Sequence, residues 1–164
     1  MQVMEEFESF THLFHQQLYL AAEPETLTFL NLDHQPVPFP VMLLLLKNAF
    51  DQDISEADFG LLKKLSEWIG VENEKVACHL LKETGISFSG LRTKHHIENI
   101  ICYGAEPADL GLNMDYQLNK PLRFMNCNLL FTAPFAEVQR QETMKKQFFE
   151  ALKILFSHLR KPSR

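Results

Sequence analysis

An apolar stripe runs through the first 23 residues. In the stretch EEFESFTHLFHQQLYLAA, large apolar side chains recur at spacings of three and four, which predicts an amphipathic helix that ends before Pro24. The helix, residues 1–23, is expected at the periphery of the fold. The stripe either packs on the protein's own core or lies in a groove of a partner, so our candidate partner-binding residues are Phe7, Phe10, Phe14 and Leu18.

Apolar runs farther along the chain predict strands. The run VMLLLL at 41–46 does not alternate with polar residues, which indicates a strand buried on both faces, as in a mainly parallel sheet between helices. The prolines at 36, 38 and 40 predict a stiff, extended connector before it. The other predicted strands are 27–32, 75–81, 97–104 and 122–132, the last either one bent strand or a small hairpin around residues 126–128.

Helical patterns separate these strands. A helix is predicted from the Ser55 cap to the Gly70 stop, and 85–94 is either a loop or a short helix. Pro107 starts a short helical turn that Gly111 ends, and Pro134 opens the last helix, whose polar middle marks a solvated face or a break. We therefore predict an α/β fold of three layers, α/β/α, with a small, mainly parallel sheet of about four to five strands. The chain, 1–164, is one domain with its α/β body at 27–160.

Composition limits the possible partners and the compartment. The formal net charge of −5 gives no overall attraction for nucleic acid, so we expect no direct nucleic-acid binding unless a local basic strip provides it. The acidic N-terminus does not resemble a signal peptide, and no apolar run is long enough to cross a membrane, so we expect a cytoplasmic protein. The cysteines, which sit in apolar runs and predict reduced thiols, are Cys78, Cys102 and Cys127.

Common catalytic and cofactor motifs are absent from the sequence, which predicts no cofactor and no metal. The neighbours His95 and His96 would point to opposite faces of a strand, and Cys78 and His79 would diverge in the same way. The carboxylates of the DQD stretch, 51–53, either hold Mg²⁺ at the sheet edge or lead into the helix cap.

The stretch YGAEPADLGLN at 103–113 follows a predicted strand and resembles the water-activating loop of the uracil-DNA glycosylases. Gly104, Glu106 and Pro107 carry this resemblance, and TAP at 132–134 takes the place of that family's second motif. Glu106 replaces the family's aspartate, Ala108 the aromatic residue that stacks on the flipped base, and Ala133 the second motif's histidine. We therefore predict no catalytic residue, and interpret this degenerate loop as a capped turn.

The order of elements resembles the psi subunit family of the bacterial DNA polymerase III holoenzyme. The resemblance covers roughly 28–156: an apolar strand, an acid-rich capped helix, a strand, a later strand ending in Gly and Pro, and a final strand, proline turn and long helix. It implies a non-catalytic connector in DNA replication, with a clamp-loader partner for the N-terminal segment. The alternative is an enzyme, or a degenerate enzyme, that acts on nucleic acid on a glycosylase-like scaffold. The sequence leaves the oligomeric state open.

Overall fold

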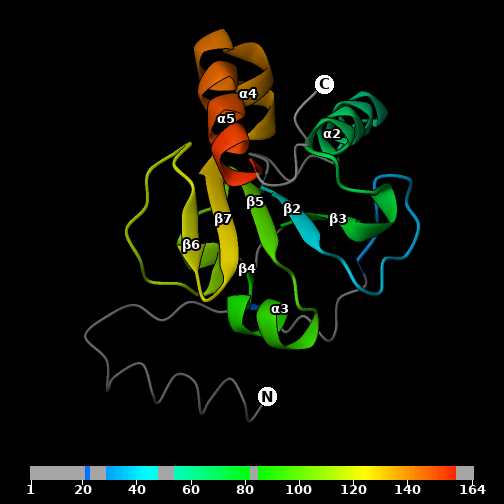
Figure 1. The fold of residues 1–164 in the computed structure, drawn as a ribbon, viewed down its shortest axis with the longest axis vertical. Coiled ribbons are helices and arrows are strands. Elements are labelled where there is room, and N and C mark those ends of the chain that lie inside the picture. The colour runs from blue at the N-terminus through cyan, green and yellow to red at the C-terminus, as the bar shows by residue number, and fades with distance from the viewer. Residues whose placement is uncertain (1–20, 23–28, 48–53, 82–84, 158–164) are drawn as a thin grey trace.

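A mainly parallel sheet forms the centre of the computed structural model, which describes residues 21–22, 29–47, 54–81 and 85–157. Within these residues the sheet has five strands in the order β3-β2-β5-β7-β6, and only the β6–β7 pair is antiparallel (Figure 1). This confirms the predicted α/β class. The strands are β2 (Met42–Leu46), β3 (Val76–Leu80), β5 (Asn99–Tyr103), β6 (Leu122–Phe124) and β7 (Cys127–Thr132).

Strand β2 is buried along its whole length, as its unbroken apolar run predicts. Leu44 packs in the core on one face of the sheet, and its neighbour Leu43 packs in the core on the other face. Because successive strand residues point to opposite faces, a strand between two layers needs apolar side chains at every position.

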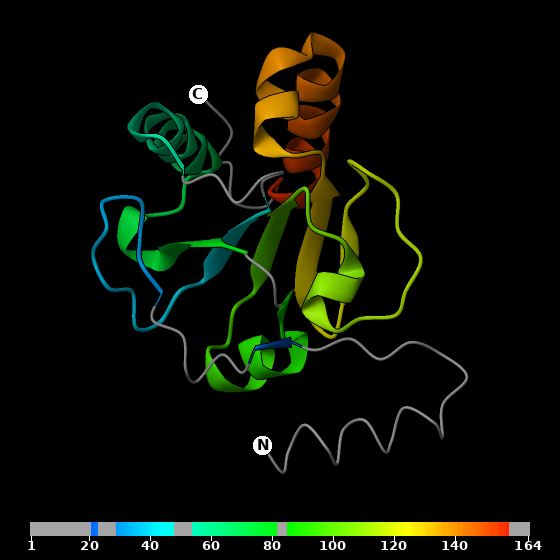
Figure 2. The same cartoon turned by 180° about the vertical axis from the view of Figure 1, so that it is seen from behind.

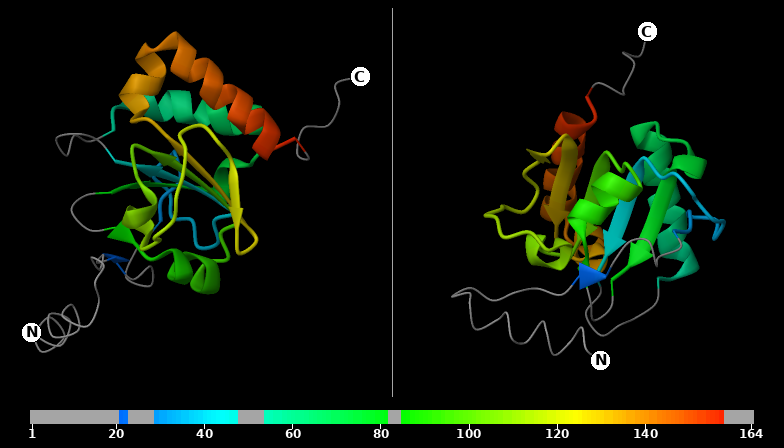
Figure 3. Two further views of the ribbon diagram at one scale, coloured as in Figure 1. Left: turned by 90° about the vertical axis from the view of Figure 1, so that its left-hand side faces the viewer. Right: turned by 90° about the horizontal axis from the view of Figure 1, so that it is seen from below.

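The thicker helical layer consists of α2 (Glu56–Ile69), α4 (Phe135–Arg140) and α5 (Glu142–Leu155), which cover one face of the sheet (Figure 3). Helix α2 has the predicted caps: the Ser55 side chain accepts a hydrogen bond from the Asp58 amide, and Gly70 is left-handed. The last helix is interrupted at Gln141, whose backbone is extended, so its polar middle is a break.

A thinner layer covers the other face of the sheet. It contains α3 (Phe88–Lys94) and the 3₁₀ turn η4 (Pro107–Leu110). The sequence predicts either a loop or a short helix at 85–94, and the structure shows the short helix α3, capped by Ser87. A short parallel pair, β1 (Ala21–Ala22) with β4 (Gly85–Ile86), lies at the same end of the molecule as α3 (Figure 2). The predicted N-terminal helix therefore does not extend through residues 21–22, because their backbone pairs with β4.

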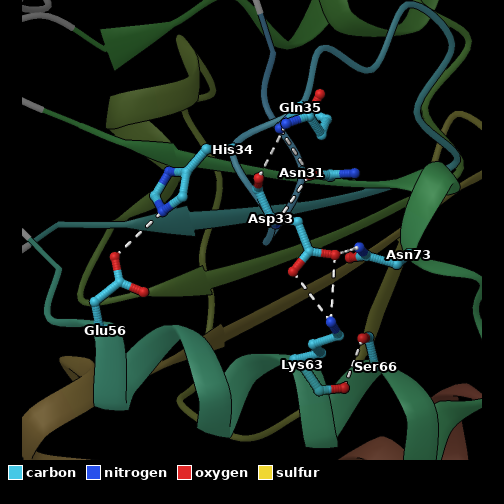
Figure 4. A network of polar contacts seen from close by, with 8 residues as sticks. All are labelled: Asn31, Asp33, His34, Gln35, Glu56, Lys63, Ser66 and Asn73. Carbon is cyan, nitrogen blue, oxygen red and sulfur yellow. Dashed lines mark hydrogen bonds and ion pairs between the residues drawn. The ribbon is translucent and has the colours of Figure 1, made fainter.

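The prediction of a strand at 27–32 is wrong for residues 29–32, the part of this range that the structure describes. Only Leu30 forms strand-like bridges, to Pro36 and Cys78. The Asn31 side-chain oxygen accepts hydrogen bonds from the amides of Asp33, at 2.9 Å, and Gln35, at 3.0 Å, and so folds the chain into a turn (Figure 4). The turn overlaps the start of the predicted extended connector, and the chain after the turn pairs back, since the Val37 amide donates to the Phe29 carbonyl at 2.8 Å.

Polar and charged side chains fix this loop to helix α2 and to Asn73, which follows that helix. Asp33 accepts hydrogen bonds from Lys63 Nζ at 3.0 Å and from the Asn73 side-chain amide, and His34 Nε2 lies 3.5 Å from Glu56 Oε1 (Figure 4).

Residues 122–132, for which the sequence predicts either one bent strand or a small hairpin, form a hairpin. Its two-residue turn is Met125–Asn126, where both residues have positive φ, as the twist of a hairpin requires.

Candidate functional site

The carboxyl edge of the sheet is the first place to look for a site in an α/β fold. The chain passes from β2 outward to β3 and then returns to β5 on the other side of β2. Ligands of open α/β sheets bind at such a reversal, beyond the carboxyl ends of the two central strands. Here those ends carry Lys47, after β2, and Gly104, after β5, and the Lys47 amide donates to the Tyr103 carbonyl at 2.9 Å.

Gly104 lets three segments meet at this edge. Its φ is +75°, and a Cβ added to it would lie 2.6 Å from the Lys47 carbonyl oxygen and 3.1 Å from Pro134 Cγ. Its amide donates to the Thr132 carbonyl at 2.9 Å. The structure therefore brings together the two loops that resemble glycosylase motifs, GAEP and TAP.

Glu106 and Pro107 form the start of the turn η4. Glu106 is exposed, and its backbone amide donates to Asp109 Oδ2 at 2.9 Å, whereas Pro107 is buried. Gly111 ends the turn in the left-handed conformation, with φ +69°. The local geometry is the capped turn that the sequence predicts.

Asp109 is the charged centre of this edge, and sequence reasoning missed it. Lys47 Nζ lies 2.9 Å from its Oδ1 and 3.1 Å from its Oδ2. Tyr116 stands nearby: burial raises the pKa of its phenol, and the carboxylates of Glu106 and Asp109 raise it further. The signal available in the sequence is the charge of Lys47 directly after a fully apolar strand.

An apolar pocket of about 250 Å³ opens between α2 and the α4–α5 pair. Trp68 and Phe149 meet in it edge to face, with ring centroids 5.3 Å apart. The centroid of the Tyr103 ring lies 5.3 Å from the ring centroids of both Phe135 and Phe148. We call this the α2–α5 pocket; its lining residues are Leu61, Lys64, Leu65, Trp68, Tyr103, Phe135, Gln139, Lys145, Phe148 and Phe149.

The consecutive pair Phe148–Phe149 is the sequence signal for this pocket. Adjacent helical residues point about 100° apart, so on an amphipathic helix the second of two neighbouring phenylalanines is directed toward the edge of the buried face. Phe148 is buried at 2% exposure, and Phe149 is half-buried against Trp68 at the pocket. The polar lining comes from Lys64, Gln139 and Lys145.

The cysteines are free thiols, as predicted. Burial raises the pKa of Cys78 to about 12 and that of Cys127 to about 11, and it raises the pKa of Cys102 as well. Burial lowers the pKa of His79, which contacts Phe29. Thiols with raised pKa values are protonated at neutral pH and are therefore poor nucleophiles.

The candidate partner-binding residues Phe7, Phe10, Phe14 and Leu18 lie outside the described residues, as do Asp51 and Asp53. Among the residues that the structure does describe, no three His, Cys, Asp or Glu side chains are grouped so that they could hold a metal ion. None of the helices in this part of the chain is long and apolar enough to span a membrane.

Comparison with known protein-family models and with curated proteins gives no match for this chain.

Proposed function

We propose that the protein is a non-catalytic interaction module, in which the α2–α5 pocket receives an apolar side chain of a partner protein. The single observation that carries the proposal is the pocket's composition. Leu61 is 40% exposed at its opening, and the Trp68–Phe149 pair provides an aromatic wall. Aromatic residues in such hollows are typical centres of binding energy at protein interfaces.

Charge favours an acidic partner segment. Lys64 and Lys145 belong to the pocket lining, one from α2 and one from α5. A carboxylate next to the inserted apolar side chain would interact favourably with either ammonium group. Such complementary charges increase the association rate and select the partner.

The proposed partners are clamp-loader or other proteins of the DNA replication machinery, with the protein acting as a psi-like connector. This part of the proposal rests on the resemblance in the order of elements. The order of elements from the apolar strand β2 to the terminal helix α5 is what we take to support it. A function in DNA replication implies a cytoplasmic location.

The carboxyl edge of the sheet supports a non-catalytic function over base excision. Asp109, the half-buried carboxylate of the edge, is held by Lys47 and by the backbone amide of Glu106. Glu106 itself starts a turn and lies exposed. These contacts give both acids a structural role in the turn.

A pull-down with purified clamp-loader subunits and, separately, with other proteins of the replication machinery, at low and at moderate salt, tests the proposal. The full chain is expected to retain one of these proteins through its body, and Leu61→Glu is expected to lose that protein because a charge at the pocket opening would have to be desolvated. Ile154→Glu is the matched control, since Ile154 is also on the surface, 69% exposed, but outside the pocket lining.

The outcomes separate the two parts of the proposal. Retention of no replication protein under either condition would contradict the replication partners. If Leu61→Glu and Ile154→Glu reduce retention equally, or if neither reduces it, the result would contradict the pocket as the docking site.

A further inference from the structure

A polar cleft of about 540 Å³ lies at the amino end of the sheet strands, away from the carboxyl edge. It is formed by the end of α3, the segment that leads into β5, and the β6–β7 hairpin, which lie together at one end of the sheet (Figure 1). We call it the arginine cleft. Its lining residues are Arg92, His96, Glu98, Arg123, Asn126 and Asn128.

We propose that the arginine cleft binds a nucleoside phosphate, with the phosphate group between Arg92 and Arg123. This goes beyond the proposed docking function and does not depend on it. The two sites share no lining residue.

The two arginines have donors to offer a ligand. Arg92 lines the cleft and uses Nη1 to bind the Ile97 carbonyl, at 2.6 Å, which holds its guanidinium in place beside the segment that leads into β5. Within the described part of the chain, Arg123 forms no ion pair within 4.0 Å. Guanidinium groups bind phosphate through paired N–H donors.

The cleft is held by contacts between its strands. Asn128 donates from its side-chain amide to Asn99 Oδ1, at 2.8 Å, and from its backbone amide to the Glu98 carbonyl, also at 2.8 Å. Arg123 pairs with Asn128 across the hairpin. The arginines are therefore carried by elements whose relative positions are fixed before a ligand arrives, which lowers the entropic cost of binding.

Glu98 determines what kind of phosphate compound fits. A free phosphate ion would be repelled by this carboxylate in the same cleft. A nucleoside phosphate adds hydroxyl and amino donors at a distance from its phosphate, and these can bind Glu98 and the amide oxygens of Asn126 and Asn128. The volume also agrees, since ligand pockets measure about 300–1,000 Å³.

Calorimetric titration of the full chain with inorganic phosphate, AMP and a short single-stranded oligonucleotide with a 5′-phosphate tests the inference. We expect AMP to bind more tightly than phosphate. Binding of the oligonucleotide in addition would identify a nucleic-acid end as a second source of the same chemistry. Arg123→Gln is expected to weaken binding of AMP about tenfold.

Arg140→Gln is the matched control, because Arg140 is an exposed arginine on α4 that does not line the cleft. Glu98→Gln is expected to reduce the preference for AMP over phosphate. Absence of binding by all three probes at millimolar concentration, equal binding by Arg123→Gln and the native chain, or an unchanged preference in Glu98→Gln would each overturn the inference.

Discussion

Lys47 Nζ lies 2.9 Å from Oδ1 of Asp109, an ion pair between residues 62 positions apart that joins the end of β2 to the turn η4. The aspartate side chain is 19% exposed and that of the lysine 41%. Asp109 also accepts the Glu106 amide. One carboxylate therefore stabilises both a local turn and the connection of that turn to the sheet.

Substitutions of Lys47 and of Asp109 should lower the free energy of unfolding by different amounts. Lys47→Met removes only a partly exposed ion pair, which is expected to lower the free energy of unfolding by about 0.5 kcal/mol. Asp109→Ala also removes the acceptor for the Glu106 amide and is expected to cost about 1.5 kcal/mol. Urea unfolding measures both. Asp109→Asn, which can still accept the amide, should fall between them, and equal costs for Lys47→Met and Asp109→Ala would contradict this role.

Gly104→Ala is expected to destabilise the protein by about 2 kcal/mol or more. The new Cβ would combine a positive φ with a contact of 2.6 Å to the Lys47 carbonyl oxygen. Gly60→Ala in helix α2 is the control, because nothing lies within 4 Å of its added Cβ. It should stabilise the helix by about 0.5–1 kcal/mol. Thermal unfolding compares the two, and similar effects from both would contradict the close packing of Gly104.

Stability should decrease at alkaline pH through Cys127. Burial raises the pKa of this thiol from 9.0 to about 11. Because the folded-state pKa is raised, the stabilising contribution is complete below pH 9.0 and is lost as the pH rises through 11; it amounts to about 3 kcal/mol. The advantage of the native chain over Cys127→Ala in urea should shrink over this range. A constant difference would contradict the prediction.

The sequence predicts the elements whose signals are local. The apolar run of β2 and the Ser55 cap and Gly70 stop of α2 each act within a few residues. The break at Gln141 is one of the two alternatives, a solvated face or a break, that the polar middle of the last helix left open. The turn at Asn31 was missed although it is local, because its apolar neighbours Phe29 and Leu32 are typical of a strand. Its side-chain oxygen competes with strand pairing for the backbone amides.

The candidate sites depend on contacts that sequence periodicity does not report. Trp68 and Phe149 both appear as apolar helix positions, and only the packing of α2 beside α5 makes them face one another. Arg92 and Arg123 come from a helix and a hairpin whose meeting is set by the strand order. Such pairs are brought together by topology.

Site-specific photocrosslinking tests the docking pocket most directly. p-Benzoylphenylalanine is placed at position 61, at the opening of the α2–α5 pocket, or at position 154 as the control, and each protein is irradiated with purified clamp-loader subunits or with other purified replication proteins. We predict a crosslink from position 61 to an apolar side chain beside an acidic segment of one of these proteins, and none from position 154. Crosslinking from position 154 alone, or from neither position, would contradict the account.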